Sequence, residues 1–84
     1  MIHVFVTIPV EGKWPTGDEL ALRDEVVNAL CNEQIGECTG CGGGMGEMDY
    51  SFAVTDETAA RFTIERVMKL VMPRFAYRAR FSSY

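Results

Sequence analysis

The chain has 84 residues, of which 48% are hydrophobic and 24% are charged. This size and composition predict a single domain over residues 1–84 with its own packed core, and they exclude a disordered chain. The formal net charge of −4 argues against nucleic acid or an anionic membrane as the main partner, because phosphate groups are bound chiefly by Lys and Arg.

The compartment is indicated by what the sequence lacks. No apolar run approaches the roughly 20 residues that a membrane span needs. The start, Met1–Val4, has neither the basic residues nor the long apolar stretch of a signal peptide. The three cysteines are an odd number, so intrachain disulfides cannot use all of them. These features predict a protein of the reducing cytoplasm.

A strand and a helix are predicted first. Residues 2–8 alternate, with Ile2, Val4, Val6 and Ile8 on one face, which is typical of a strand. After a loop over 9–15, Thr16 and Glu19 form a capping box that begins a helix. That helix should end near Gln34, with Gly36 as the stop. Its buried stripe is expected to be Leu22, Val26, Ala29 and Leu30.

A hairpin is predicted next. One strand should run from about Glu37 and another from Glu47 to Thr55, and the glycines of 42–46 should supply the turn between them. In the later strand, alternate residues are apolar, which predicts one buried face: Met48, Tyr50, Phe52 and Val54.

A second helix and a last strand complete the pattern. Thr55 or Asp56 should cap the helix, and Pro73 should end it. Phe75–Phe81 then alternates as a strand. The apolar stripe expected along the helix comprises Ala60, Ile64, Val67, Met68 and Val71.

The predicted order, βαββαβ, is the split βαβ pattern and resembles the ferredoxin-like fold. That resemblance implies an α+β two-layer sandwich, with an antiparallel sheet in the order 4-1-3-2 and both helices on one face. It covers the whole chain but is one of pattern only. Because this fold hosts many activities, it names no function.

Cys38 and Cys41 have the spacing of a redox or metal-binding pair. In a regular strand, however, residues three apart point to opposite faces, so the two thiols should diverge unless Gly40 creates a bulge. Heavy-metal-binding domains of the ferredoxin-like fold carry such a pair in the loop after the first strand, and here that loop contains no cysteine. His3 and Cys31 are not expected to complete a site, because the third predicted strand separates His3 from the second.

Phosphate binding and catalysis are not predicted. Phosphate loops lead a strand into a helix, whereas Gly42–Gly44 lead into another strand, next to Glu47 and Asp49. The serines have only His3 as a possible base, and Glu47 with Asp49 is interpreted as a solvated strand face. An RNA-recognition surface would need stacking aromatics on the third strand, which has none on this face. We therefore predict a non-enzyme without a cofactor.

The open face of the sheet is the predicted interaction surface. Phe5 should lie between arginines on one side and acids on the other, an arrangement that suits a two-fold homodimer. Trp14 and Phe62 are further contact candidates. The predicted interface residues are Phe5, Glu47, Asp49, Arg78, Arg80, Trp14 and Phe62.

The leading hypothesis is a small acidic binding protein that acts as a homodimer or with another protein. One alternative is a thiol or metal protein that uses Cys38 and Cys41. Another is an acidic, immunity-type inhibitor of a basic toxin or nuclease, since opposite charge speeds association. A third is small-molecule sensing, for which the sequence names no ligand.

Overall fold

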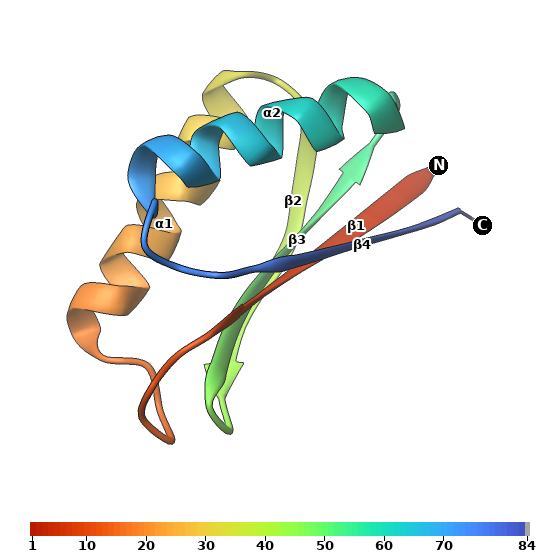
Figure 1. The fold of residues 1–84 in the computed structure, drawn as a ribbon. Coiled ribbons are helices and arrows are strands. Elements are labelled where there is room, and N and C mark those ends of the chain that lie inside the picture. Colours follow the sequence, from red (N-terminus) through yellow and green to blue (C-terminus); the bar gives the residue numbers. More distant parts are fainter. Residues whose placement is uncertain (84) are drawn as a thin grey trace.

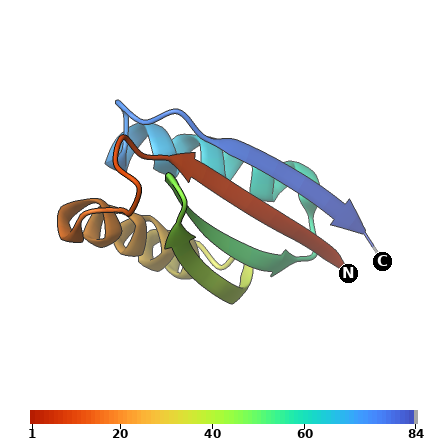
Figure 2. The same cartoon turned by 90° about the horizontal axis from the view of Figure 1, so that it is seen from below.

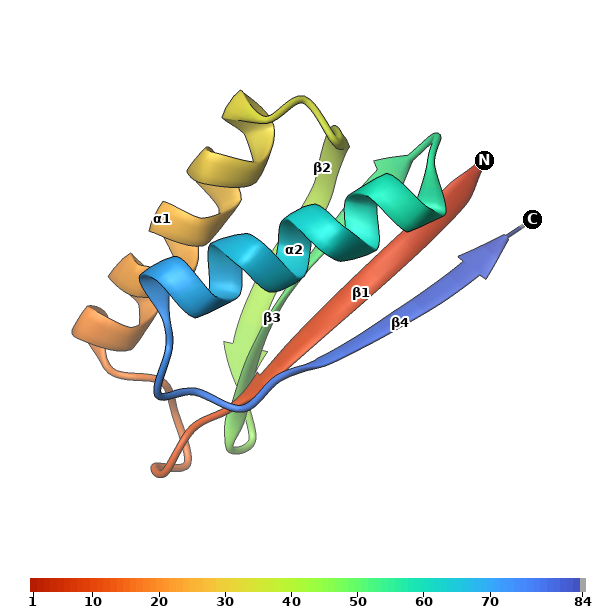
Figure 3. The same cartoon turned by 45° about the horizontal axis from the view of Figure 1, so that its top comes forward.

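The computed structural model describes residues 1–83 and contains six regular elements in the predicted order. The four strands form one antiparallel sheet in the order β2-β3-β1-β4, which confirms the ferredoxin-like α+β arrangement. Both helices lie on one face of the sheet (Figure 1 and Figure 3). The elements are β1 (Ile2–Pro9), α1 (Gly17–Asn32), β2 (Gly36–Gly44), β3 (Glu47–Val54), α2 (Glu57–Val71) and β4 (Arg78–Ser83).

The core lies between the sheet and the helices, and the predicted apolar stripes face into it. The two central strands contribute half of the buried core residues, because alternate side chains from Val4 to Ile8 in β1 and from Met48 to Val54 in β3 are fully buried. The buried core residues are Val4, Val6, Ile8, Val26, Leu30, Met48, Tyr50, Phe52, Val54, Ala60, Ile64, Val67, Met68 and Met72.

The predicted helix starts are confirmed. Thr16 accepts a hydrogen bond from the Glu19 backbone N–H at 3.1 Å, and the Glu19 carboxylate accepts one from the Thr16 N–H at 2.7 Å. Asp56 caps α2 by accepting from the Ala59 N–H at 3.0 Å. Each cap satisfies backbone donors that have no partner within the helix.

The end of α1 differs from the prediction. The helix stops at Asn32, and Gln34, rather than Gly36, adopts the left-handed conformation with φ of 58°. Gly36 already belongs to β2, where a Cβ would lie 2.0 Å from the Ala53 carbonyl oxygen. Glycine is therefore required at position 36 because two strands approach closely there, and not because a helix ends there.

The last strand begins later than predicted, at Arg78 instead of Phe75. It pairs with β1 only from Ile2 to Thr7. Beyond that point Pro9 has no backbone N–H to donate, and the Val10 N–H is already bonded to the Gly46 carbonyl at 2.9 Å. Phe75 and Tyr77 still pack against the core, from a loop.

The glycine-rich turn is shorter than predicted. β2 continues to Gly44, and only Met45 and Gly46 form the turn, with φ values of 57° and 83°. Two successive positive φ values are typical of a two-residue type I′ hairpin turn. The glycines at 42 and 43 are therefore strand residues.

The sheet has one covered face and one open face (Figure 2). The two ends of the chain lie side by side, since Ile2 is paired with Ser83. None of the helices within residues 1–83 combines the length and the apolarity that a membrane crossing requires.

Candidate functional site

A β-bulge in the edge strand β2 decides where the two cysteines point. Cys38 lies opposite Phe52, Gly40 opposite Ser51 and Cys41 opposite Tyr50, so three steps along β2 correspond to two along β3. Thr39 is the extra residue of this bulge. Its hydroxyl lies 2.8 Å from that of Ser51, which ties the bulge to the neighbouring strand.

The expectation that the two thiols diverge is therefore wrong. Directly opposed residues of an antiparallel pair point to the same face, and Phe52 and Tyr50 both point into the core with no exposed surface. Cys38 and Cys41 thus share the face of β2 that looks toward the helices. In a regular strand, residues two apart point to the same face. Because of the bulge, residues three apart do so here.

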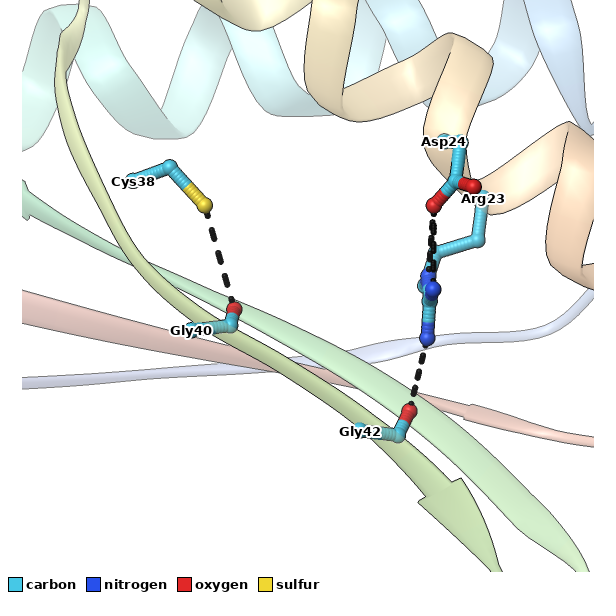
Figure 4. Close-up of polar contacts among 5 residues, drawn as sticks. All are labelled: Arg23, Asp24, Cys38, Gly40 and Gly42. Carbon is cyan, nitrogen blue, oxygen red and sulfur yellow. Dashed lines mark hydrogen bonds and ion pairs between the residues drawn. The ribbon is translucent and has the colours of Figure 1, made fainter.

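The environments of the two thiols differ. Cys38 is half-buried and packs against the core, and its thiol donates weakly to the Gly40 carbonyl with an S···O distance of 3.9 Å (Figure 4). Cys41 is exposed near the end of the same strand. Both are free thiols. The pair therefore combines one anchored sulfur with one that solvent can reach.

Arg23 is the charged residue beside this pair. Its side chain is only 11% exposed, and it reaches from α1 to donate to the Gly42 carbonyl at 2.9 Å (Figure 4). Asp24 holds the other side of the guanidinium, at 2.9 Å and 3.2 Å. Arg23 thus binds a carbonyl of the edge strand, where backbone groups lack a neighbouring strand.

The pKa of the Cys41 thiol depends on these surroundings. Burial raises the pKa of Cys41 above its usual value, and Cys38 raises this pKa further through its charge and a side-chain hydrogen bond, whereas the positive charge of Arg23 lowers it. The neutral thiol is therefore favoured at neutral pH. A strongly bound cation would have to displace its proton.

Other ligand candidates do not join the two cysteines. Within the described part of the chain, no group of three or more His, Cys, Asp or Glu side chains could hold a metal ion. Cys31 is exposed on α1, and His3 lies in β1 opposite Ala53 and Ser82. As predicted, β3 separates β1 from β2.

The open face brings most of the predicted interface residues together. Arg78, Thr7, Asp49 and Gly42 form one row across the four strands, because each is opposite the next. The neighbouring row contains Arg80, Phe5, Ser51 and Gly40. Phe5 is 41% exposed, and Glu47 lies beyond Asp49 along β3. The face thus carries two positive charges on β4, two negative charges on β3 and an aromatic ring between them.

Trp14 and Phe62 are exposed, as predicted, but lie away from this group. Trp14 packs in the loop after β1, where a Cβ on Gly44 would come within 2.5 Å of its ring. Phe62 projects from α2, which covers the opposite face of the sheet, and lies beside Glu65, Arg66 and Lys69. These two aromatics therefore mark other surfaces.

Comparison with known proteins identifies no relative. No protein-family model, curated protein or solved structure gives a significant match to this chain.

Sequence reasoning missed two residues, Arg23 and Thr39. Arg23 precedes the buried Val26 by three positions and Leu30 by seven, so helical periodicity places it on the flank of the buried stripe. That spacing could have revealed it. Thr39 carries no comparable signal, because the bulge depends on the pairing of β2 with β3.

Proposed function

We propose that this chain is a non-enzymatic binding protein that acts as a homodimer through the open face of its sheet. The observation that carries the proposal is the row Arg78–Thr7–Asp49, with Phe5 in the row beside it. A surface that pairs with its own copy must be self-complementary, and this face presents both charge signs on either side of an aromatic residue.

The order of charges favours one orientation of the second copy. A two-fold axis parallel to β1 exchanges the two sides of the face and leaves each row above the same row. Arg78 of one copy then lies over Asp49 of the other, and the Phe5 rings meet at the axis. An axis perpendicular to the strands would place like charges together, which is unfavourable.

The size of the face predicts the strength of the dimer. Four strands spaced about 4.8 Å apart, with about eight residues each, give a flat area of roughly 500 Å² per copy. The two copies together then bury about 1,000 Å², which is at the lower end for specific interfaces. We therefore expect a dissociation constant in the micromolar range, about −8 kcal/mol.

Sedimentation equilibrium over a range of protein concentrations tests this proposal. We expect Arg78→Glu and Asp49→Arg each to weaken the dimer by about tenfold or more, because each places like charges together. The double variant R78E/D49R restores opposite charges and should recover most of the affinity.

A matched control changes the same charge elsewhere. Lys69→Glu alters a side chain on α2 that is 75% exposed and lies off the open face, so it should leave the dimer unchanged. A chain that remains monomeric at high micromolar concentration would refute the homodimer. A dimer that responds equally to Lys69→Glu and Arg78→Glu would refute the assigned face.

A further inference from the structure

We propose that Cys38 and Cys41 form a two-coordinate site for a soft monovalent metal ion, represented by Cu(I), on the helix-facing side of the edge strand. The site is separate from the open face, so the metal site and the homodimer are tested independently. Its basis is the bulge at Thr39, which turns two thiols three residues apart to one face.

The spacing of the two cysteines allows both sulfurs to reach one ion. Their partners Phe52 and Tyr50 are two residues apart, so the cysteine Cα atoms lie about 6.5 Å from each other. This separation is near the upper end of the disulfide range, which is about 4.4–6.8 Å. A bridging ion lengthens the span between the sulfurs and removes that constraint.

The donor set selects the class of ion. Thiolate sulfur is a soft ligand and favours Cu(I), whereas structural zinc sites use four ligands in a tetrahedron. Among the residues that the structure describes, no third His, Cys, Asp or Glu completes such a cluster. Two thiolates alone therefore fit a d¹⁰ ion that accepts two-fold coordination.

Ion binding changes the charge at this edge of the sheet. Binding releases one proton from each thiol and gives a complex of two thiolates and one Cu(I), with net charge −1. The Arg23 guanidinium donates to the carbonyl of Gly42, the residue after Cys41, and forms an ion pair with Asp24, so the Arg23–Asp24 pair adds no net charge beside the site.

Anaerobic titration of the fully reduced chain with Cu(I), in competition with a coloured Cu(I) chelator, tests the site. We expect one ion per chain. Cys38→Ser and Cys41→Ser should each lower the affinity more than about 100-fold, beyond the loss typical of a residue that only supports a ligand. Cys31→Ser removes an exposed cysteine of α1, and this control variant should bind Cu(I) with the affinity of the unmodified chain.

Deletion of Thr39 tests the role of the bulge itself. Without Thr39, Gly40 and Cys41 still oppose Ser51 and Tyr50 in a regular strand, so both thiols keep the same face and the Cu(I) affinity should stay within about tenfold. Circular dichroism confirms that the variant is folded.

Three results would overturn the site. The first is failure of the unmodified chain to compete for Cu(I), and the second is Cu(I) binding that survives loss of both cysteines. The third is a folded Thr39 deletion that has lost binding. Zinc serves as the control ion, and stoichiometric zinc held by Cys38 and Cys41 would also contradict two-coordinate selectivity.

Discussion

Strands β2 and β3 are paired along nearly their whole length, yet they are held in place by different means. In β3, four alternate side chains are fully buried and fix the strand by packing. In β2, no side chain is fully buried, five of nine residues are glycine, and a bulge shifts the register. A core strand is thus positioned by its side chains, whereas this edge strand is positioned by its backbone and by Arg23.

This difference between the two strands explains why functional side chains can lie on β2. Fully packed positions tolerate little change, because each methylene group in a core contributes to stability. The edge strand has few such constraints and can present two thiols without disturbing the core. The comparison also predicts that equivalent substitutions in the two strands have unequal effects.

The largest contrast is expected for the opposed pair Phe52 and Cys38. Phe52→Ala leaves a cavity in the core and should reduce the free energy of unfolding by about 3–5 kcal/mol. Cys38→Ala removes one half-buried sulfur and should cost less than about 1.5 kcal/mol. Urea denaturation measures both, and similar losses for the two variants would show that β2 is packed as tightly as β3.

The next contrast concerns backbone approach at Gly36. A Cβ there would lie 2.0 Å from the Ala53 carbonyl oxygen, so Gly36→Ala should destabilise the fold by about 2–3 kcal/mol. Gly17→Ala is the control, because a Cβ added at Gly17 would have no neighbouring atom within 4 Å and φ there is not positive. That variant should be neutral or stabilising by up to about 1 kcal/mol in the same assay. Equal stability of the two variants would mean that the strands do not approach so closely.

The smallest contrast concerns Tyr50, which lies opposite Cys41. Its hydroxyl is buried and has no hydrogen-bond partner among the described residues, and burial followed by the charge of Tyr77 raises its pKa. The unfolded chain therefore loses this proton first as the pH rises through about 10. Ionisation of Tyr50 in the unfolded chain therefore lowers the free energy of unfolding above that pH, with a slope of up to about 1.4 kcal/mol per pH unit, and has no effect well below it.

Tyr50→Phe isolates that contribution. The variant should show a weaker alkaline loss of stability than the unmodified chain. Near pH 7 it should be equal or more stable by about 1 kcal/mol, because an unsatisfied buried hydroxyl is removed. Thermal melts between neutral and strongly alkaline pH provide the measurement. Identical pH profiles would show that Tyr50 does not stay protonated in the folded chain.

Side-chain pattern made most of the fold predictable from the sequence. Alternation in β1 and β3, the stripes of the two helices and the Thr16 capping box each matched the structure, because they express periodicity or local hydrogen bonding. The strand order was implied by the resemblance of the βαββαβ pattern to the ferredoxin-like fold, and the structure confirms it. The charged open face followed from parity, which placed Phe5 between the arginines of β4 and the acids of β3.

The cysteine site could not be predicted in the same way. Parity arguments assume an unbroken strand, and one extra residue reverses the face of every residue after it. Thr39 becomes that extra residue because its neighbours Cys38 and Gly40 pair with adjacent residues of β3. The start of β4 was missed for a related reason, since the loss of pairing depends on Pro9 and on the bond from Val10 to Gly46.

The bulge at Thr39 determines where both thiols point, and inter-strand nuclear Overhauser effects between backbone protons of β2 and β3 can detect it. We predict cross-strand contacts that join Cys38 with Phe52 and Cys41 with Tyr50. Contacts that join Cys38 with Phe52 but Cys41 with Asp49 would reveal a regular strand, place the two thiols on opposite faces and contradict the account.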